Sequence, residues 1–319
     1  MTTVLVLGGG PDAEREVSIV SAKAIHQGCL DAGLDAELLI IDQPNIDEVK
    51  SWKADVIFPA LHGQFGEGGQ LQALLEEAGH AFVGNRSRAS RLAMDKMGTK
   101  LVALRCGLLT PAACVISDAD LNDPAHAVCP FELPVVIKPI ADGSSVGLSM
   151  CYTNEDWIAG LEQAKADIEN HPGRVYMIER LIEAREFTVS VLEDDQGELK
   201  ALPIVEIAPA SGVYDFEAKY EKNDTVYTVE PELPDGMADQ MAFEALRVCM
   251  ALGIEHLGRV DFLGCPDGHT TMLEVNTMPG FTPTSLFPMA AKADGFLMAS
   301  LCEHLVGCAV RSGGCIQGT

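Results

Sequence analysis

The N-terminal stretch VLVLGGGPDAEREVS, residues 4–18, predicts the first strand–turn–helix unit of the fold. Its apolar residues predict a buried strand, its glycines a tight turn, and the acidic residues after them the first turn of a helix. Gly8, Gly10 and Ala13 fit the pattern G-x-G-x-x-A, in which such a turn binds the pyrophosphate of a dinucleotide. The stretch therefore raises the question of which ligand this turn would bind.

A dinucleotide fits the rest of the sequence poorly. A dinucleotide site needs an acidic residue about 20 positions after the glycines to bind the ribose. The only candidate at the end of the second predicted strand is Asp42, which is too distant in the sequence from the glycines. Glu14 and Glu16 occupy the first helical turn, where a pyrophosphate needs positive potential. Both glutamates can simply complement the helix dipole. Alternatively, Glu14 faces the crevice above the sheet and binds a cation such as a substrate ammonium.

The first part of the chain alternates strand-like and helical patterns, which predicts an open parallel sheet. The expected strands are 4–8, 36–42 and 54–63, and the expected helices are 14–33 and 70–79. A helical pattern at 87–107 leads to strands at 133–139, 148–152, 174–182 and 186–194 and to helices at 154–168 and near 236–252. These changes of pattern predict an N-terminal domain at 1–84, a central region at 85–180, a C-terminal region at 181–308 and a disordered tail at 309–319.

Composition narrows the class of protein. The chain has 319 residues, of which 47% are apolar, and this is too many for a disordered protein. Its 47 acidic residues outnumber its 22 lysines and arginines, and the net charge of −25 repels nucleic acid and anionic membranes. The sequence contains no apolar run long enough for a membrane helix, no signal-peptide pattern and no C-x-x-C pair among its ten cysteines. We therefore expect a cytoplasmic enzyme-sized protein with reduced thiols, no nucleic-acid partner and no membrane insertion.

Two further loops carry candidate ligand groups. LHGQFGEGGQLQ, residues 61–72, follows a predicted strand, and this places His62 and Glu67 where open α/β sheets bind ligands. The alternative is that both side chains are only solvated. KPIADGSSVG, residues 138–147, offers Lys138 and a series of N–H and hydroxyl groups to phosphates, although the chain has no P-loop motif. Its alternative is an ordinary hairpin turn with an exposed lysine.

The segment GRVDFLGCPDGHTTMLEVN, residues 258–276, predicts a β-hairpin around Asp267-Gly268. With a two-residue turn there, Asp261 faces Glu274. By the same count Arg259 faces Asn276, and the alternation of side chains along a strand puts all four on one face. The residues between them are apolar, so the opposite face is expected to be buried.

The four polar residues of this hairpin allow two readings. One is a patch of cross-strand salt bridges on a solvated face. The other is a cation site, because the oxygens of Asp261, Glu274 and Asn276 suit Mg²⁺, which commonly also binds substrate phosphates. Arg259 would then be available for a developing oxyanion or phosphoryl charge. Such a site would allow ATP to bind to an acidic protein.

Taken together, the motifs resemble those of the ATP-grasp carboxylate–amine ligases, and specifically of the bacterial D-alanine–D-alanine ligase family. The resemblance runs from about residue 4 to 306 and is carried, in the family's order, by GGGPDAEREVS, HGQFGEGGQLQ, FVGNRSRASRLAMDK, VVIKPIADGSSVG, EFTVSVL, YDFEAKY, GRVDF and LEVNTMPGFTPTSL. It implies an α/β ATP-grasp fold with an N-terminal open parallel βαβ domain, a central ATP-grasp subdomain with a glycine-rich flap and a C-terminal α+β subdomain. Because the family is commonly dimeric, it also implies a homodimer.

The resemblance implies a ligation in two steps that uses ATP and two Mg²⁺ or Mn²⁺ ions. The carboxylate of one D-alanine attacks the γ-phosphate of ATP and forms an acyl phosphate and ADP. The amine of a second D-alanine then displaces phosphate and gives D-alanyl-D-alanine for peptidoglycan precursors. The alternatives are a related ligase that forms D-alanyl-D-serine or D-alanyl-D-lactate, and an ATP-binding sensor or scaffold that has lost its chemistry.

The resemblance also assigns expected roles to individual residues. The expected catalytic and D-alanine-binding residues are Glu14 at the first ammonium, Ser144 and Tyr220 hydrogen-bonded to it, His62, Tyr214, Arg259 and the Gly280 N–H as the oxyanion hole, and Ser285 and Leu286 at the second carboxylate. The expected ATP-binding residues are Lys96, Lys138, Ser144, Ser145 and Lys219 at the phosphates, Glu179, Leu181 and Ile182 at the adenine, Glu186 at the ribose, and Asn276. The expected metal ligands are Asp261, Glu274 and Asn276.

A lid and several departures complete the resemblance. The aromatic segment 211–221 is expected to close over the site, and its Lys219-Tyr220 pair accompanies an amine acceptor in this family, which favours D-alanine over D-lactate. Four positions depart from the family pattern. Gly68 stands where the family usually has Asp or Asn, and Asp142 stands where Glu is common. His256 replaces a small residue, and Leu181 replaces a tryptophan that some members have. None of them removes a predicted catalytic group, but Gly68 weakens the prediction for Glu67.

Overall fold

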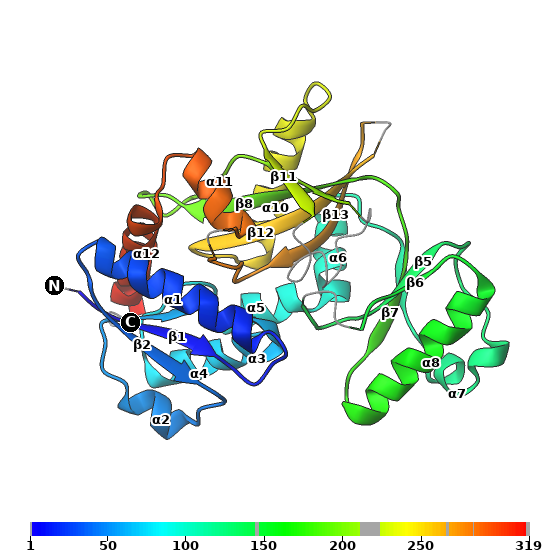
Figure 1. Ribbon diagram of the computed structural model, residues 1–319, viewed down its shortest axis with the longest axis horizontal. Helices are drawn as coiled ribbons and strands as arrows, with labels where there is room; N and C mark the ends of the chain where they lie inside the picture. The colour runs from blue at the N-terminus through cyan, green and yellow to red at the C-terminus, as the bar shows by residue number, and fades with distance from the viewer. Residues whose placement is uncertain (1, 144–146, 211–223, 266–267, 283, 317–319) are drawn as a thin grey trace.

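The computed structural model describes residues 2–143, 147–210, 224–265, 268–282 and 284–316, which form three β-sheets with helices around them (Figure 1). Strands β1 (Thr3–Gly9), β2 (Asp35–Ile41) and β3 (Val56–Pro59) form a parallel sheet in the order β2-β1-β3. Its helices are α1 (Arg15–Asp31), α2 (Ile46–Ser51), α3 (Gly63–Glu67) and α4 (Gln70–Ala78). The predicted open parallel βαβ arrangement at the N-terminus is thereby confirmed.

The turn after β1 depends on its glycines. Gly9 and Gly10 have backbone φ angles of +96° and +97°, which residues other than glycine rarely adopt. A Cβ on Gly9 would lie only 2.4 Å from the carbonyl oxygen of Ile41. The close approach to β2 and the left-handed turn bring the chain directly to Glu14, the residue that precedes α1.

The central region forms an antiparallel sheet in the order β4-β7-β5-β6. Its strands are β4 (Ala113–Val115), β5 (Val135–Pro139), β6 (Ser149–Cys151) and β7 (Tyr176–Arg180), and its helices are α7 (Asp118–Asn122), the 3-10 turn η1 (Pro124–His126) and α8 (Asn154–Asn170). Trp157 and Leu161 of α8 are buried in one cluster with Ile137 and Ile178 of the sheet. A reciprocal pair of hydrogen bonds between Thr153 and Asp156 caps the N-terminus of α8.

The third sheet has the order β11-β10-β8-β12-β13, with β9 paired to β8. Its strands are β8 (Arg185–Glu193), β9 (Leu199–Ala201), β10 (Val205–Pro209), β11 (Thr225–Val229), β12 (Leu257–Gly264) and β13 (Thr270–Asn276), and α10 (Met237–Leu252) packs on it. The predicted helical pattern at 87–107 forms two helices, α5 (Ser87–Met94) and α6 (Lys96–Arg105). Between them, Asp95 accepts a hydrogen bond from the Gly98 N–H at 2.9 Å and caps α6.

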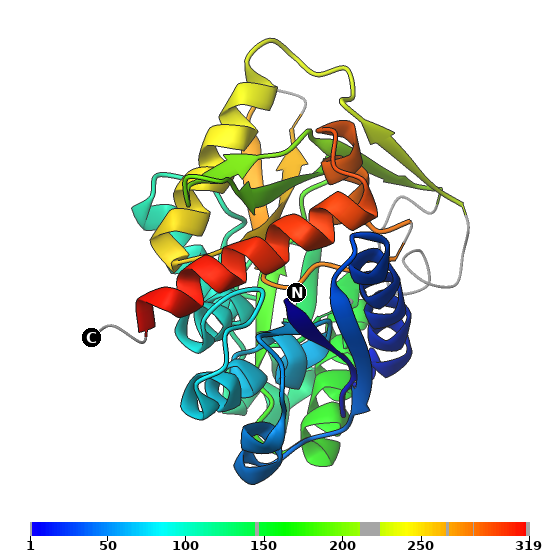
Figure 2. The same ribbon diagram turned by 90° about the vertical axis from the view of Figure 1, so that its left-hand side faces the viewer.

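The last two helices, α11 (Leu286–Ala293) and α12 (Met298–Ile316), connect the first and third sheets. Figure 2 shows α12 crossing the molecule between them. Phe58 of β3, Val205 of β10 and Leu305 of α12 are fully buried members of one core cluster. Across the described ranges no single helix has the length and apolarity of a membrane span, although α11 and the Met298–Gly313 part of α12, bent by 99°, meet these criteria as a pair.

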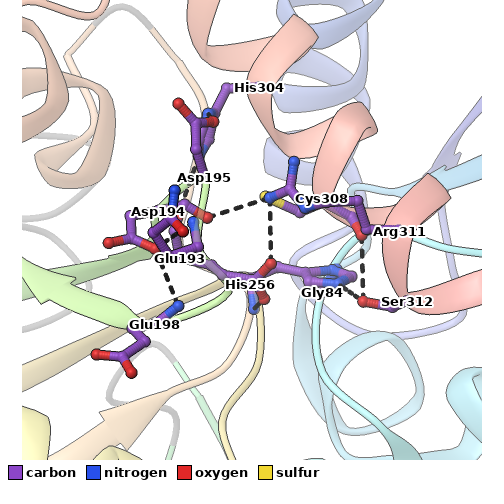
Figure 3. A network of polar contacts seen from close by, with 11 residues as sticks. Gly84, Glu193, Asp194, Asp195, Glu198, His256, His304, Cys308, Arg311 and Ser312 are labelled. Atoms are coloured by element: carbon purple, nitrogen blue, oxygen red, sulfur yellow. Dashed lines mark hydrogen bonds and ion pairs between the residues drawn. The ribbon is translucent and has the colours of Figure 1, made fainter. Parts of the chain in front are cut away.

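The predicted disorder of the tail at 309–319 is wrong for residues 309–316, because α12 continues to Ile316 and Ala309 is fully buried. Polar contacts hold the end of this helix to the third sheet (Figure 3). Arg311 Nη2 lies 3.3 Å from Glu193 Oε1 and donates to the carbonyl oxygen of Asp194 at 3.1 Å. Ser312 Oγ lies 2.9 Å from His256 Nε2. Residues 317–319 lie outside the described part of the chain.

His256, the departure noted in the sequence, is the centre of these contacts (Figure 3). It is buried and has a φ of +45°, and its Nδ1 accepts the Gly84 N–H at 3.0 Å. Because Nδ1 accepts, the neutral ring carries its proton on Nε2 and donates it to Ser312. The imidazole therefore joins the end of the N-terminal region, the start of β12 and the end of α12.

Protonation of His256 is expected to destabilise the protein in acid. Burial lowers the pKa of His256 to about 4, below its value of about 6.5 in an unfolded chain. The unfolded state therefore binds a proton first, and the stability that the neutral ring confers above pH 6.5 is lost as the pH falls toward 4. Replacing His256 by Asn should reduce the slope of unfolding free energy against pH in this window by up to about 1.4 kcal/mol per pH unit.

Urea denaturation at several pH values between 4.5 and 7.5 would measure this slope for wild type and His256→Asn. His126→Asn is the control, because His126 is exposed and its hydrogen bond to Asp123 raises its pKa, which gives a contribution of the opposite sign. An unchanged slope in His256→Asn would contradict the neutral buried histidine.

Candidate functional site

Strands β12 and β13 pair as the sequence predicts at the polar residues. Arg259 pairs with Asn276 and Asp261 with Glu274. Beyond Asp261 the register shifts at a β-bulge, so that Phe262 pairs with Met272. The Cys265 N–H donates to the carbonyl oxygen of His269, whereas a two-residue turn at 267–268 would be closed by residues 266 and 269. The observed closing pair therefore differs from the predicted one by one residue. Asp267 itself lies outside the described residues. The bulge compensates for this offset, and the predicted partners are correct.

The third sheet packs one face against α10, and the other face combines core residues such as Val205 and Leu257 with the polar residues of β8, β12 and β13, here called its polar face. Val260 and Phe262 of β12 are fully buried in a cluster with residues of α10, as expected. The alternate residues, Arg259 and Asp261, lie on the other face together with Thr188 of β8, which is directly opposite Asp261. Glu186 lies two residues from Thr188 on β8 and faces the same way.

Arg259 and Asp261 form a bidentate ion pair. Arg259 Nε donates to Asp261 Oδ1 and Nη2 donates to Oδ2, both at 2.9 Å. Thr188 Oγ1 donates to Asp261 Oδ1 at 2.6 Å. Sequence reasoning left Arg259 available for a substrate anion, whereas here its guanidinium compensates a nearly buried carboxylate. The same contacts hold the aspartate in a fixed orientation.

The predicted metal ligands present oxygen atoms on this face. Asp261 and Glu274 are cross-strand partners, and Asn276 Oδ1 accepts the Met278 N–H at 3.1 Å. Two carboxylates and a carboxamide are the donor types that Mg²⁺ prefers. Within the described ranges, no group of three or more His, Cys, Asp and Glu residues is placed as metal ligands are, so the fit rests on this mixed set.

Three lysines surround the metal candidate Glu274 and the predicted adenine contact Glu179. Lys96 Nζ lies 3.6 Å from Glu274 Oε2 and donates to the carbonyl oxygen of Asp142. Lys138 Nζ lies 2.7 Å from Glu179 Oε1, and Lys100 Nζ lies 2.5 Å from Glu179 Oε2. Although burial opposes it, the two lysines lower the pKa of Glu179. This carboxylate therefore stays ionised between two cations.

Lys100 is a buried residue of this site that sequence reasoning missed. Its Nζ also donates to Thr110 Oγ1 at 2.7 Å and to the carbonyl oxygen of Pro111 at 3.0 Å. Burial lowers the pKa of Lys100, and Glu179 opposes this effect. Its partner Glu179 lies on β7, distant in the sequence from α6, so no local pattern in the sequence indicates the contact.

Glu14, His62 and Glu67 follow the carboxyl ends of β1 and β3, where parallel sheets form their ligand crevice, and all three are buried. His62 Nε2 lies 3.2 Å from Ser21 Oγ, and His62 Nδ1 lies 3.2 Å from the carbonyl oxygen of Met278. Burial lowers the pKa of His62 to about 4, so the ring is neutral near pH 7. The alternative that the side chains of His62 and Glu67 are only solvated is therefore wrong, because both are buried.

Glu67 and Glu14 are close enough to influence each other's charge. Burial and the carboxylate of Glu14 raise the pKa of Glu67 to about 8, although the Gly63 N–H donates to Glu67 Oε1 at 3.1 Å. Arg259 acts on both His62 and Glu67 through its charge. The crevice and the polar face of the third sheet thus share one electrostatic environment, in which a cation would relieve the repulsion between the two glutamates.

Gly280 and Ser285 lie together before α11. A Cβ on Gly280 would be 2.7 Å from Ser285 Oγ, so a side chain at this position would force the serine hydroxyl to move. Ser285 Oγ accepts the Thr282 N–H at 3.0 Å and lies 2.7 Å from Thr282 Oγ1. Leu286 is buried in the core, and it begins α11.

The remaining predicted residues are distributed as follows. Leu181 and Ile182 are partly buried between β7 and β8, and the Leu181 N–H donates to the carbonyl oxygen of Pro134 at 3.1 Å. Some predictions fall outside the described residues. They are the whole predicted lid at 211–221, with Tyr214, Lys219 and Tyr220, and the two predicted loop residues Ser144 and Ser145.

Comparisons with known proteins show which family this chain resembles. Residues 108–307 match the family model described as D-ala D-ala ligase C-terminus. A D-alanine–D-alanine ligase of Bordetella petrii is 41% identical over 303 residues, which are 94% of this chain and 90% of the relative. One from Methylacidiphilum infernorum is 37% identical over 305 residues, which are 95% and 94% of the two chains.

Solved structures show the same architecture. The VanG D-Ala:D-Ser ligase of Enterococcus faecalis has a TM-score of 0.79 and 25% identity, and the match covers 97% of this chain and 99% of that one. The D-alanine–D-alanine ligase of Coxiella burnetii has a TM-score of 0.81 and 23% identity, with 99% and 96% covered, and this likeness concerns the fold. The expected ATP-grasp fold is confirmed.

Proposed function

Since the chain belongs to the D-alanine–D-alanine ligase family, we propose that it joins two D-alanine molecules at the expense of ATP. The carboxylate of the first D-alanine attacks the γ-phosphate, which gives an acyl phosphate and ADP. The amine of the second attacks the acyl carbon, and phosphate leaves from a tetrahedral intermediate. The reaction needs this activation because an amine does not displace an unactivated carboxylate oxygen. The product is D-alanyl-D-alanine, a precursor of peptidoglycan.

The buried crevice of the N-terminal sheet supports binding of the first D-alanine. Its ammonium would lie at Glu14, where it offsets the repulsion between Glu14 and Glu67. Burial and this repulsion together raise the pKa of Glu67. His62 is neutral and does not repel a cation. Burial of these groups excludes water, which strengthens the charge interaction and keeps the carboxylate nucleophile in place.

The lysines and the polar face of the third sheet support binding of the triphosphate. Lys96 and Lys138 supply positive charge, and a bound nucleotide would compete for them with the carboxylates of Glu274 and Glu179. Asp261, Glu274 and Asn276 would hold Mg²⁺ or Mn²⁺, and such an ion neutralises phosphate charge when bound. Positioning and charge neutralisation account for most of the catalysis in phosphoryl transfer.

The second step needs stabilisation of the tetrahedral oxyanion. Arg259 and the backbone N–H of Gly280 are the proposed donors, and Ser285 and the start of α11 would bind the carboxylate of the second D-alanine. The single observation that carries the whole proposal is the position of Arg259. It is bound to the metal candidate Asp261 and acts by its charge on His62 and Glu67 in the substrate crevice.

A mass-resolved product assay tests the proposed reaction. The purified protein would be incubated with MgATP and D-alanine alone, and then with D-alanine plus D-serine or D-lactate. We expect D-alanyl-D-alanine with equal amounts of ADP and phosphate, and loss of all three products with EDTA. A preferred mixed product would assign the chain to the D-serine or D-lactate alternative, which the likeness to a D-Ala:D-Ser ligase keeps relevant. No ATP turnover would contradict the proposal.

Location and assembly follow as part of the same proposal. A reaction that consumes ATP belongs in the cytoplasm, where ATP is available. The homodimer implied by the family resemblance stays a prediction, and light scattering after size-exclusion chromatography would test it.

A further inference from the structure

The polar groups beneath the predicted glycine-rich loop form one network that no predicted role explains. Arg174 lies between α8 and β7, and its Nε is 2.9 Å from Asp142 Oδ2. Its Nη1 donates to both carboxylate oxygens of Asp167 on α8 at 2.8 Å. Tyr176, the first residue of β7, donates its hydroxyl to Asp167 Oδ2 at 2.8 Å. Four side chains from three segments of the central region are thus joined through one guanidinium and one carboxylate.

This network touches both ends of the loop around residues 144–146, which themselves lie outside the described residues. On one side, Asp142 precedes Gly143, and its carbonyl oxygen accepts a hydrogen bond from Lys96. On the other side, Gly147 has a φ of +71°, and a Cβ there would lie 2.6 Å from the hydroxyl of Tyr176. The two ends therefore rest on the two side chains that Asp167 joins.

The same network reaches the substrate crevice. A Cβ on Gly143 would lie 3.0 Å from Glu14 Oε2, so this backbone packs directly against the proposed ammonium site. Burial raises the pKa of Asp12, and the charge of Arg174 opposes this shift together with the Phe65 N–H, which donates to Asp12 Oδ2 at 2.8 Å. The charge of this guanidinium in the central region therefore acts on Asp12 in the N-terminal region.

We propose that Arg174 is a positioning residue that fixes the residues flanking the phosphate-binding loop, Asp142–Gly143 and Gly147, against Glu14 and Lys96. Arg174 is only 20% exposed and its partners Asp142 and Asp167 only 15% and 24%, so these ion pairs are shielded from water more than surface pairs are. The shorter Asp142, in place of the glutamate usual in the family, reaches this arginine. The inference rests on the proposed function for the loop's role in binding ATP.

Two variants test the inference through nucleotide binding. Arg174→Met removes both ion pairs, whereas Asp142→Asn removes only the charge next to the loop and leaves the Arg174–Asp167–Tyr176 contacts intact. We expect each to weaken binding of MgADP, measured by calorimetry, and to raise KM for ATP by about tenfold. KM for D-alanine at saturating ATP should rise less than KM for ATP, because only the Gly143 backbone packs against Glu14. The double variant should lose no more than Arg174→Met alone, because both act through one contact. Arg174→Lys, which keeps a cation, should recover most of the affinity.

The control is Lys200→Met, which removes an ion pair of 2.6 Å to Asp294 far from the loop. It should leave KM for ATP unchanged. If Asp142→Asn binds MgADP as wild type does while Arg174→Met only lowers the unfolding temperature, Arg174 is merely structural and the proposal is overturned. Failure of the proposed function looks different, because the wild type would then bind MgADP without forming a dipeptide in the product assay.

Discussion

Replacing Glu274 by alanine is expected to abolish ATP turnover, lowering kcat by at least about a thousandfold, or about 4 kcal/mol of transition-state stabilisation. Glu274 faces Asp261 across the hairpin and lies 3.6 Å from Lys96 Nζ, so it is placed to bridge a cation and the phosphate-binding lysines. Without it, the proposed site retains one carboxylate and one amide, too few ligands for a tightly held Mg²⁺.

The fold should survive this substitution. The Glu274 side chain is 34% exposed and its contact to Lys96 is long, so loss of the pair costs about 1 kcal/mol or less. Circular dichroism and thermal unfolding should therefore match wild type, while ADP release is lost. Glu206→Ala is the matched control, since Glu206 is a carboxylate of the same sheet that pairs with Arg185 outside the proposed site. Full ADP release by Glu274→Ala, at any Mg²⁺ concentration, would rule out this metal site.

The hairpin shows how far a sequence pattern can be trusted. The alternation of polar and apolar residues correctly placed Arg259 and Asp261 on one face, because side-chain alternation is a property of every strand. The turn position was offset by one residue and the bulge compensated for it. A bulge depends on how both strands pack against α10 and β8, and a single strand's sequence carries no signal for it.

Long-range polar contacts were the part of the site that could not be predicted. Lys100 and Glu179 are far apart in the sequence and meet because Lys100 reaches from α6, which packs against β13 and α10, to Glu179 on β7 of the central sheet. The tail was predicted to be disordered because it matches none of the family's motifs, whereas Arg311 and Ser312 bind the Asp194 carbonyl and His256 at the third sheet and belong to α12. Local propensity governs a helix end only when no tertiary contact overrides it.

The second large effect is expected at Arg259. Replacing it by methionine removes the proposed oxyanion donor. This should lower kcat by about a hundred- to a thousandfold, the range seen when one such donor is lost. The same change leaves Asp261 with Thr188 as its neighbour and no guanidinium, and breaking a buried pair in this way costs about 3 kcal/mol or more. Activity and stability should therefore fall together.

A second substitution separates the two losses. In Arg259→Met with Asp261→Asn the buried negative charge is gone, so the unfolding free energy should return most of the way to wild type while ligation stays absent. Arg259→Lys should be intermediate in stability, because one ammonium cannot reproduce the bidentate contact. Urea denaturation and the ADP-release assay measure the two quantities on the same samples. If Arg259→Met keeps kcat within tenfold of wild type, the guanidinium only neutralises Asp261, and the oxyanion must be stabilised by other groups.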